Sequence, residues 1–157
     1  MQYYFFVPRM VKMNLNYLNK ICVNHQIRMT CRSMTKYYDK FLKPYDLKST
    51  QFSLLVAINS QENGNISQIS NSIFMERTTF LRNLKPLLKK GLVKLDNIET
   101  RRKDKIYKVT PEGKLLLDKS LDGWEAANDE VEKSLDGKAN RKIFLNSLNI
   151  LREKTIP

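Results

Sequence analysis

The fold of this 157-residue chain is decided by one stretch, ERTTFLRNLKPLLKKGLV, which runs from Glu76 to Val93. Each residue of an α-helix turns by about 100°, and this spacing gathers one apolar stripe. The stripe consists of Phe80, Leu81, Leu84, Leu87 and Leu88. Gly91 is a typical helix stop, and the two lysines before it suit the negative end of the helix dipole. The pattern therefore predicts an amphipathic helix over residues 76–90.

The opposite face of this helix carries hydroxyl groups, amines and one guanidinium. It consists of Thr78, Thr79, Arg82, Lys85, Pro86 and Lys89. Such groups suit the major groove of DNA, where Arg reads guanine edges and Thr contacts thymine methyl groups or phosphates. Pro86 removes a backbone hydrogen bond and should bend the helix, which leaves Arg77 to Asn83 as the base-reading half. An amphipathic surface helix without a ligand is the alternative for this segment taken alone.

The neighbouring segments predict a helix-turn-helix followed by a basic hairpin. A helix over residues 51–59, capped by Ser49-Thr50, places Phe52, Leu55 and Val56 on one face, and a short helix capped by Ser67 follows it. Residues 92–95 and 105–109 favour strands. The loop between them contains Arg101, Arg102 and Lys103, which suit a narrow minor groove, although a solvated turn is the alternative. We assign phosphate contacts to Lys85, Lys89, Lys90 and Lys105.

Long helices are predicted at both ends of the chain. Residues 14–42 have apolar positions at helical spacing, and Pro44 ends this helix. Thr110-Pro111 begins another helix, which Asp136-Gly137 breaks. Its apolar positions are Leu115, Leu116, Leu121, Trp124, Ala127 and Val131. A last helix over residues 138–153 turns Phe144, Leu148 and Leu151 inward. The fold class is mainly α with a small β-hairpin wing, a winged helix-turn-helix flanked by N- and C-terminal helices.

Charge and composition favour a polyanion as the partner and argue against an enzyme. The net charge is +12, and residues 76–108 contain 11 Lys or Arg against 4 acids, which suggests a localised basic surface. The chain lacks a Gly-rich phosphate loop, a GxSxG or HExxH motif, and it has one histidine, so we expect no catalysis and no cofactor. Cys22 and Cys31 form no CxxC motif, so we expect no metal site. No apolar stretch approaches a membrane span, and we expect a cytoplasmic protein.

Three stretches resemble the MarR family of winged-helix regulators. Residues 47–55 resemble the family's second helix, and residues 76–93 resemble one branch's recognition helix, including its proline. Arg101-Arg102 and residues 109–113 resemble the wing and the start of the next helix. The resemblance implies a single domain over residues 1–157, with residues 46–110 as the DNA-binding module. It implies that residues 14–45 and 111–155 are the dimerisation helices of an obligate homodimer that reads a pseudo-palindromic operator. It also implies a repressor that a small molecule or an oxidant releases from DNA.

The effector and its site have several candidate residues. One branch of the family senses hydroperoxides through a first-helix cysteine, which aligns with Asn24, whereas Cys22 resembles a first-helix cysteine of the branch that shares this recognition helix. Cys22 is therefore a candidate redox sensor, and a buried packing residue at the dimer interface is its alternative. His25, Tyr37 and Tyr38 are candidates for lining an effector pocket, with core packing as their alternative. A non-specific nucleic-acid-binding architectural protein remains the alternative function.

Overall fold

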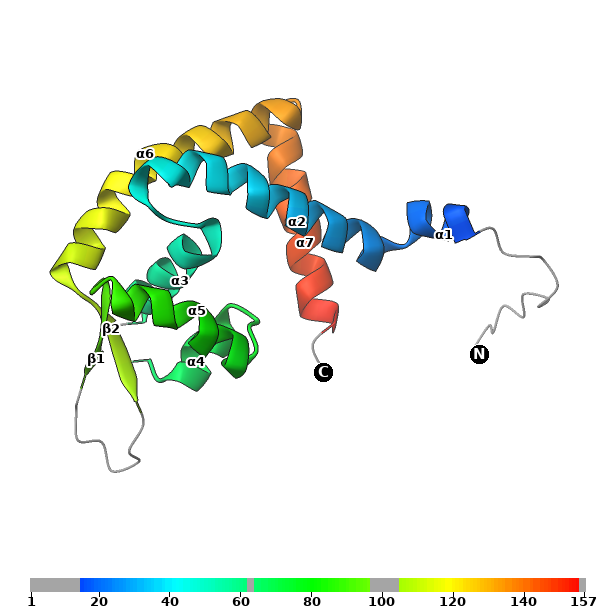
Figure 1. Cartoon of the computed structure of the whole chain (residues 1–157). Helices are drawn as coiled ribbons and strands as arrows, with labels where there is room; N and C mark the ends of the chain where they lie inside the picture. Colours follow the sequence, from blue (N-terminus) through cyan, green and yellow to red (C-terminus); the bar gives the residue numbers. More distant parts are fainter. Residues whose placement is uncertain (1–14, 62–63, 97–104, 156–157) are drawn as a thin grey trace. The chain divides into compact units, whose positions relative to one another are not determined.

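The computed structural model describes residues 15–61, 64–96 and 105–155 of the chain, which divides into two compact units, Met1–Lys36 and Tyr37–Pro157. The elements follow in the predicted order of helices and hairpin (Figure 1). They are α1 (Leu15–Ile21), α2 (Val23–Leu42), the 3-10 turn η1 (Lys43–Tyr45), α3 (Ser49–Ser60), α4 (Ile66–Ser72), α5 (Arg77–Lys89), β1 (Val93–Asp96), β2 (Ile106–Val109), α6 (Pro111–Ser134) and α7 (Lys138–Thr155).

The first predicted helix is two helices, because the chain leaves helical geometry at Cys22. The carbonyl of Cys22 accepts the N–H of Gln26 at 3.0 Å and so begins α2. The Gln26 side chain donates to the carbonyl of Asn19 at 2.7 Å, which ties the two helices across the break. The residues at the break, from Ile21 to His25, have weak helix propensity, so an interruption costs little there.

Two helix starts differ from the prediction. The carboxylate of Asp39 accepts the N–H of Ser49 at 2.7 Å, so a residue from α2 caps α3. Asn65, and not Ser67, caps α4: its side chain accepts the N–H of Gln68, and the Gln68 side chain accepts the N–H of Asn65, both at 2.9 Å. Asn favours turns and caps alike, and the sequence interpretation assigned Asn65 to the turn.

The core of the Tyr37–Pro157 unit lies where α3 and α5 meet. Leu54 and Leu55 of α3 are fully buried, as are Phe80 and Leu87 of α5. Of the three residues predicted to share one face of α3, Phe52 and Leu55 are buried and Val56 is 41% exposed, while Leu54 is also buried. This core turns one stripe of α5 inward and leaves the opposite stripe free to carry polar groups.

The strands β1 and β2 form an antiparallel hairpin at the end of α5. Val93 pairs with Val109 at its base, and Asp96 pairs with Ile106 at the far end of the ladder. Ile106 also bridges to Asn65, which fixes the hairpin to the start of α4. Both valines of the first pair are buried in the core, so the base of the wing is packed rather than free.

A compact joint connects α5, the hairpin and α6. Gly91 has φ +69°, and the N–H groups of Gly91 and Leu92 bond back to the carbonyls of Leu88 and Leu87, which closes α5 with a Schellman motif. Thr110 donates from its hydroxyl to the carbonyl of Gly91 at 2.7 Å and accepts the N–H of Gly113 at 3.1 Å. Both predictions, the stop at Gly91 and the start at Thr110-Pro111, are confirmed.

The buried face of α6 consists mostly of small residues, which the sequence analysis did not single out. Its buried positions are Gly113, Leu117, Ser120, Gly123 and Ala127. A Cβ on Gly123 would lie 2.6 Å from the carbonyl oxygen of Phe41, so α6 packs directly on the backbone at the end of α2. Leu115, Leu121 and Trp124, which we named as apolar positions of this helix, are 56%, 41% and 36% exposed in the single chain.

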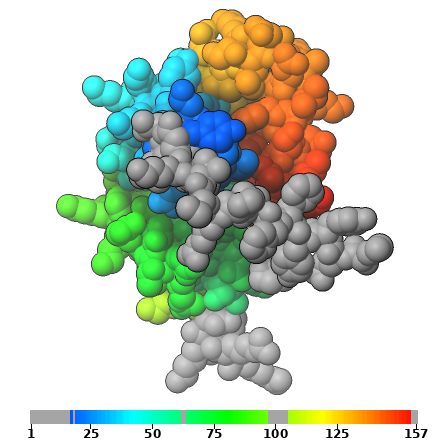
Figure 2. All heavy atoms as spheres, turned by 90° about the vertical axis from the view of Figure 1, so that its right-hand side faces the viewer, coloured from blue at the N-terminus to red at the C-terminus, as the bar shows by residue number. Residues whose placement is uncertain are grey.

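The last helix exposes its apolar side chains in the single chain. Phe144 and Leu151 are 41% and 40% exposed, so the prediction that they point inward does not hold within one chain, and Leu148 is half-buried. Figure 2 shows the atoms of α7, orange to red, open to view at the surface. Among the described residues, no helix combines the length and the apolar character needed to cross a bilayer.

The joint at Gly113 provides a test of the fold. A Cβ there would lie 2.2 Å from the carbonyl oxygen of Leu92 and 2.7 Å from Cγ1 of Val109. Gly113→Ala should therefore lower the free energy of unfolding by an amount near the upper end of the roughly 1–3 kcal/mol expected for overpacking. Urea unfolding at fixed protomer concentration measures it. Lys119→Ala, at an exposed position of the same helix, should stay within about 0.5 kcal/mol of wild type; equal effects would refute the close packing.

Candidate DNA-binding surface

The two faces of α5 are separated as the sequence predicts. Phe80, Leu84 and Leu87 are at most 1% exposed, whereas the opposite stripe meets solvent. Its exposed members are Thr78, Arg82, Lys85, Pro86 and Lys89, and Thr79 is half-buried. The helix runs on through Pro86 to Lys89. Hydroxyl, guanidinium and ammonium groups therefore share one exposed stripe on a helix whose other side is fixed in the core.

Two residues of the predicted DNA-binding set are held by neighbouring protein groups. Arg77 donates from Nη1 to the hydroxyl of Ser67 on α4 at 3.0 Å. The half-buried Asn83 donates from Nδ2 to the sulfur of Met75, 3.9 Å away, in the turn before α5. Sequence spacing grouped both residues with the base-reading half, and it could not show these contacts because both partners lie outside the helix.

The turn between α4 and α5 contains a strained aromatic residue. Phe74 has φ +52°, in the left-handed region that bulky side chains rarely adopt. The hydrogen bonds Phe74 N–H to Asn71 carbonyl and Met75 N–H to Ser70 carbonyl hold this conformation at 3.1 and 2.9 Å. These two hydrogen bonds hold the turn that leads into α5. The sequence interpretation did not single out Phe74.

Lys90, for which we predicted a phosphate contact, is paired with Asp46 in the structure. Its ammonium group lies 2.7 Å from the carboxylate of Asp46 and also donates to the backbone carbonyl of the same residue at 2.5 Å. Asp46 has φ +51° in the loop before α3. This contact ties the end of α5 to the other side of the core, which leaves Lys85 and Lys89 as the exposed amines of the helix.

The predicted wing contacts Arg101, Arg102 and Lys103 lie outside the described residues. The described part of the hairpin includes Lys94 and Lys105, which are both exposed. Lys108 is paired with Asp96 across the hairpin at 2.7 Å, so its charge is partly neutralised. The hydrogen bond from the Thr110 hydroxyl to the Gly91 carbonyl holds the base of the hairpin beside the end of α5.

The candidate effector residues fall in different parts of the chain. Cys22 and Cys31 are exposed in the single chain, and Cys22 immediately precedes the N-terminus of α2. The alternative for Cys22, packing at the dimer interface, needs a second chain and stays a prediction. His25 is half-buried in the Met1–Lys36 unit, whereas Tyr37 and Tyr38 belong to the other unit.

The two tyrosines pack against different partners. The ring of Tyr37 lies 5.2 Å from that of Phe41, centroid to centroid. Tyr38 donates its hydroxyl to Oδ1 of Asn128 at 3.1 Å, and the Arg141 guanidinium donates to the same oxygen at 3.2 Å. Burial raises the pKa of the Tyr38 hydroxyl, and Arg141 acts in the opposite direction. Tyr38 therefore links α2, α6 and α7.

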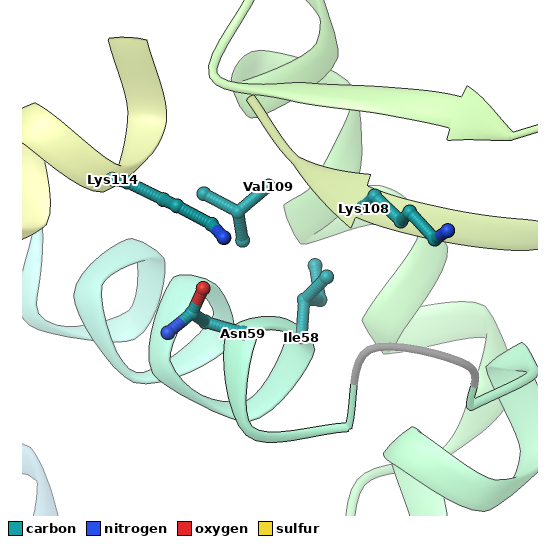
Figure 3. Close-up of a pocket in the computed structure, with 5 residues that line it drawn as sticks. All are labelled: Ile58, Asn59, Lys108, Val109 and Lys114. Carbon is teal, nitrogen blue, oxygen red and sulfur yellow. The ribbon is translucent and has the colours of Figure 1, made fainter. Parts of the chain in front are cut away.

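The hollows lined by described residues of the Tyr37–Pro157 unit include a smaller and a larger one. The smaller, of about 230 Å³, is lined by Ile58, Asn59, Lys108, Val109 and Lys114 (Figure 3). In that view Asn59 and Lys114 point toward one another, whereas the amine of Lys108 turns away. The hollow is smaller than the roughly 300–1,000 Å³ usual for small-molecule sites. The larger, of about 700 Å³, is an open groove lined by Glu132, Lys138, Arg141, Lys142, Ile143, Leu145, Asn146 and Asn149.

Comparison with known proteins identifies the same fold and class. No protein-family model matches the chain. The HTH-type transcriptional regulator SarZ of Staphylococcus haemolyticus is 28% identical over 121 residues, which cover 73% of this chain and 81% of that protein. The crystal structure of the M. tuberculosis transcriptional regulator MosR in complex with DNA is 29% identical, covers 85% of this chain and 97% of its own, and has a TM-score of 0.71. A MarR-family regulator from Rhodococcus sp. RHA1 shares the fold at 18% identity and a TM-score of 0.73, covering 88% and 97% of the two chains.

These comparisons define a winged helix-turn-helix protein. The buried and exposed stripes of α5 and the packed hairpin beside it agree with that class. The chain has a MarR-like winged helix-turn-helix fold and is similar in sequence to transcriptional regulators, one of which was solved in complex with DNA. These similar proteins are transcriptional regulators, so the predictions of a non-enzymatic protein, of the fold class and of a resemblance to MarR-family regulators are confirmed.

Proposed function

We propose that this regulator binds a pseudo-palindromic operator in double-stranded DNA as a homodimer and represses the genes beside it. The exposed stripe of α5 carries this proposal, because Thr78, Arg82 and Lys89 meet solvent while the opposite stripe is buried. In a helix-turn-helix the second helix enters the major groove, and its N-terminal residues contact base edges. Residues Arg101, Arg102 and Lys103 of the wing would then contact the adjacent minor groove.

A second copy of the chain is the partner that fits the terminal helices. The helices α6 and α7 expose large apolar side chains in the single chain. These include Leu115, Leu121, Trp124, Ile143, Phe144 and Leu151. Apolar area of this kind is usually covered in a symmetric dimer, and a dimer would set two α5 helices about one turn of DNA apart. We therefore assign residues 14–45 and 111–155 to dimerisation and residues 46–110 to DNA binding.

Selection of bound duplexes from a random pool tests the proposal and its alternative. A specific regulator should enrich a palindromic sequence and bind it about 10³-fold or more tightly than random duplex at fixed salt. A reporter gene placed behind that sequence should be silenced by the wild-type chain. A preference within a few-fold would support a non-specific architectural protein instead.

Arg82→Ala should weaken operator binding by about 1–3 kcal/mol and relax sequence preference, because the guanidinium at the centre of the exposed stripe is positioned to read a guanine edge. Lys89→Ala is the matched control on the same stripe, and it should weaken operator and random duplex alike. Fluorescence anisotropy on the operator and on single-base variants measures both effects. Equal loss on every duplex for Arg82→Ala would contradict base reading by this residue.

Phe144→Asp should shift the protein from dimer to monomer, because a carboxylate would replace an apolar ring on the exposed face of α7. Sedimentation velocity gives the mass, and operator binding should weaken with it. Asn146→Asp makes the same change in charge on the opposite side of the helix and should leave the dimer intact. A dimeric Phe144→Asp variant with normal operator binding would exclude this face of α7 from the interface.

We further propose that an effector, an oxidant or a small molecule, relieves repression. The exposure of Cys22 beside the N-terminus of α2 favours an oxidant, since a reactive thiol must be accessible. Attack of the Cys22 thiolate on a peroxide would give a sulfenic acid and release hydroxide or an alcohol.

Cys22→Ser should abolish peroxide-driven release from the operator, whereas Cys31→Ser, at the second exposed cysteine, should be released like wild type. The fraction of bound operator after titration with peroxide measures the effect. Unchanged release in Cys22→Ser would remove the thiol from the mechanism and leave a small molecule as the effector.

A further inference from the structure

Arg77 occupies a position on α5 that base-reading residues do not share. It lies seven residues before Leu84, so its Cα is only about 20° from the middle of the buried stripe. It is nevertheless exposed, because it stands at the first residue of the helix, beyond the end of the core. Its side chain therefore extends along the junction with α4, whereas Arg82 extends from the outward stripe.

A hydrogen bond fixes the direction of the Arg77 side chain. Nη1 donates to the hydroxyl oxygen of Ser67 at 3.0 Å, and Ser67 lies in the first turn of α4. A guanidinium has five N–H donors in a planar fork, so one such bond orients the group and leaves the others for an anion. An exposed arginine otherwise loses much rotamer freedom when it binds, and a preformed contact reduces that loss.

We propose that Arg77 binds a phosphate of the DNA backbone rather than a base, and that Ser67 is the residue that positions it. This inference rests on the proposed function. In a helix-turn-helix the first helix crosses the backbone while the second lies in the groove. A guanidinium held against α4 is therefore on the backbone side of the groove, where a bidentate contact with phosphate oxygens suits its geometry.

Binding of operator and random duplex across a salt series tests the inference. Arg77→Ala should weaken both duplexes equally, on the order of tenfold, and reduce the salt slope by about 1. Ser67→Ala should weaken both by about threefold with an unchanged slope, because the guanidinium charge remains. Ser67→Thr keeps a hydroxyl and should restore wild-type affinity. The double variant Ser67→Ala/Arg77→Ala should bind like Arg77→Ala alone, since the hydroxyl acts through the guanidinium.

Three results would overturn the inference. A loss confined to the operator in Arg77→Ala would make Arg77 a base reader. If the losses of DNA affinity add in the double variant, Ser67 does not act through Arg77. The same conclusion follows if Ser67→Thr binds DNA as weakly as Ser67→Ala. Failure of the proposed function is a separate outcome, seen when the wild-type chain does not distinguish operator from random duplex; the salt slopes on random duplex still decide the role of Arg77.

Discussion

Burial of one stripe of α5 against α3 is the constraint on which the DNA-binding surface depends. Phe80, Leu84 and Leu87 have almost no contact with solvent, and rotating the helix would expose them. Burying a large apolar side chain stabilises a fold by about 1.5–3 kcal/mol, so this stripe fixes the rotation of α5 firmly. The polar stripe points outward as a consequence of that burial, without a separate interaction to hold it.

The joint at Thr110 connects the end of α5 to the base of the hairpin, so the position of the hairpin base depends on that of α5. One hydroxyl satisfies both the carbonyl of Gly91, which ends α5, and the N–H of Gly113, which lies in the first turn of α6. Neither glycine position tolerates a side chain easily: Gly91 has a positive φ, and Gly113 lies against the carbonyl of Leu92. The base of the hairpin is therefore joined closely to the end of α5 and to the start of α6.

The sequence predicted the features that depend on apolar periodicity and on local turn residues. The stripe of α5, the stop at Gly91 and the start at Thr110 follow from such signals, and the structure has all three. The sequence interpretation failed where a contact between distant segments decides. Small residues at Gly113, Gly123 and Ala127 recur at helical spacing, but only the approach of another backbone makes them the buried face of α6. Phe144 and Leu151 of α7 were assigned inward, and they are exposed in the single chain, because hydrophobicity alone does not say whether one chain or two will cover a residue.

Contacts between distant segments also decide which charges of the site are paired, and the sequence does not show them. The basic block from residue 76 to residue 108 suggests a uniformly phosphate-binding segment, yet its cations differ in their partners. Lys90 is paired with Asp46 and Lys108 with Asp96, while Lys85 and Lys89 are exposed. A cation already paired with a carboxylate releases fewer counterions from DNA, so the electrostatic affinity of this surface is smaller than its net charge implies. Net charge therefore identifies the kind of partner, and the hydrogen bonds of each side chain determine which cations are free to meet it.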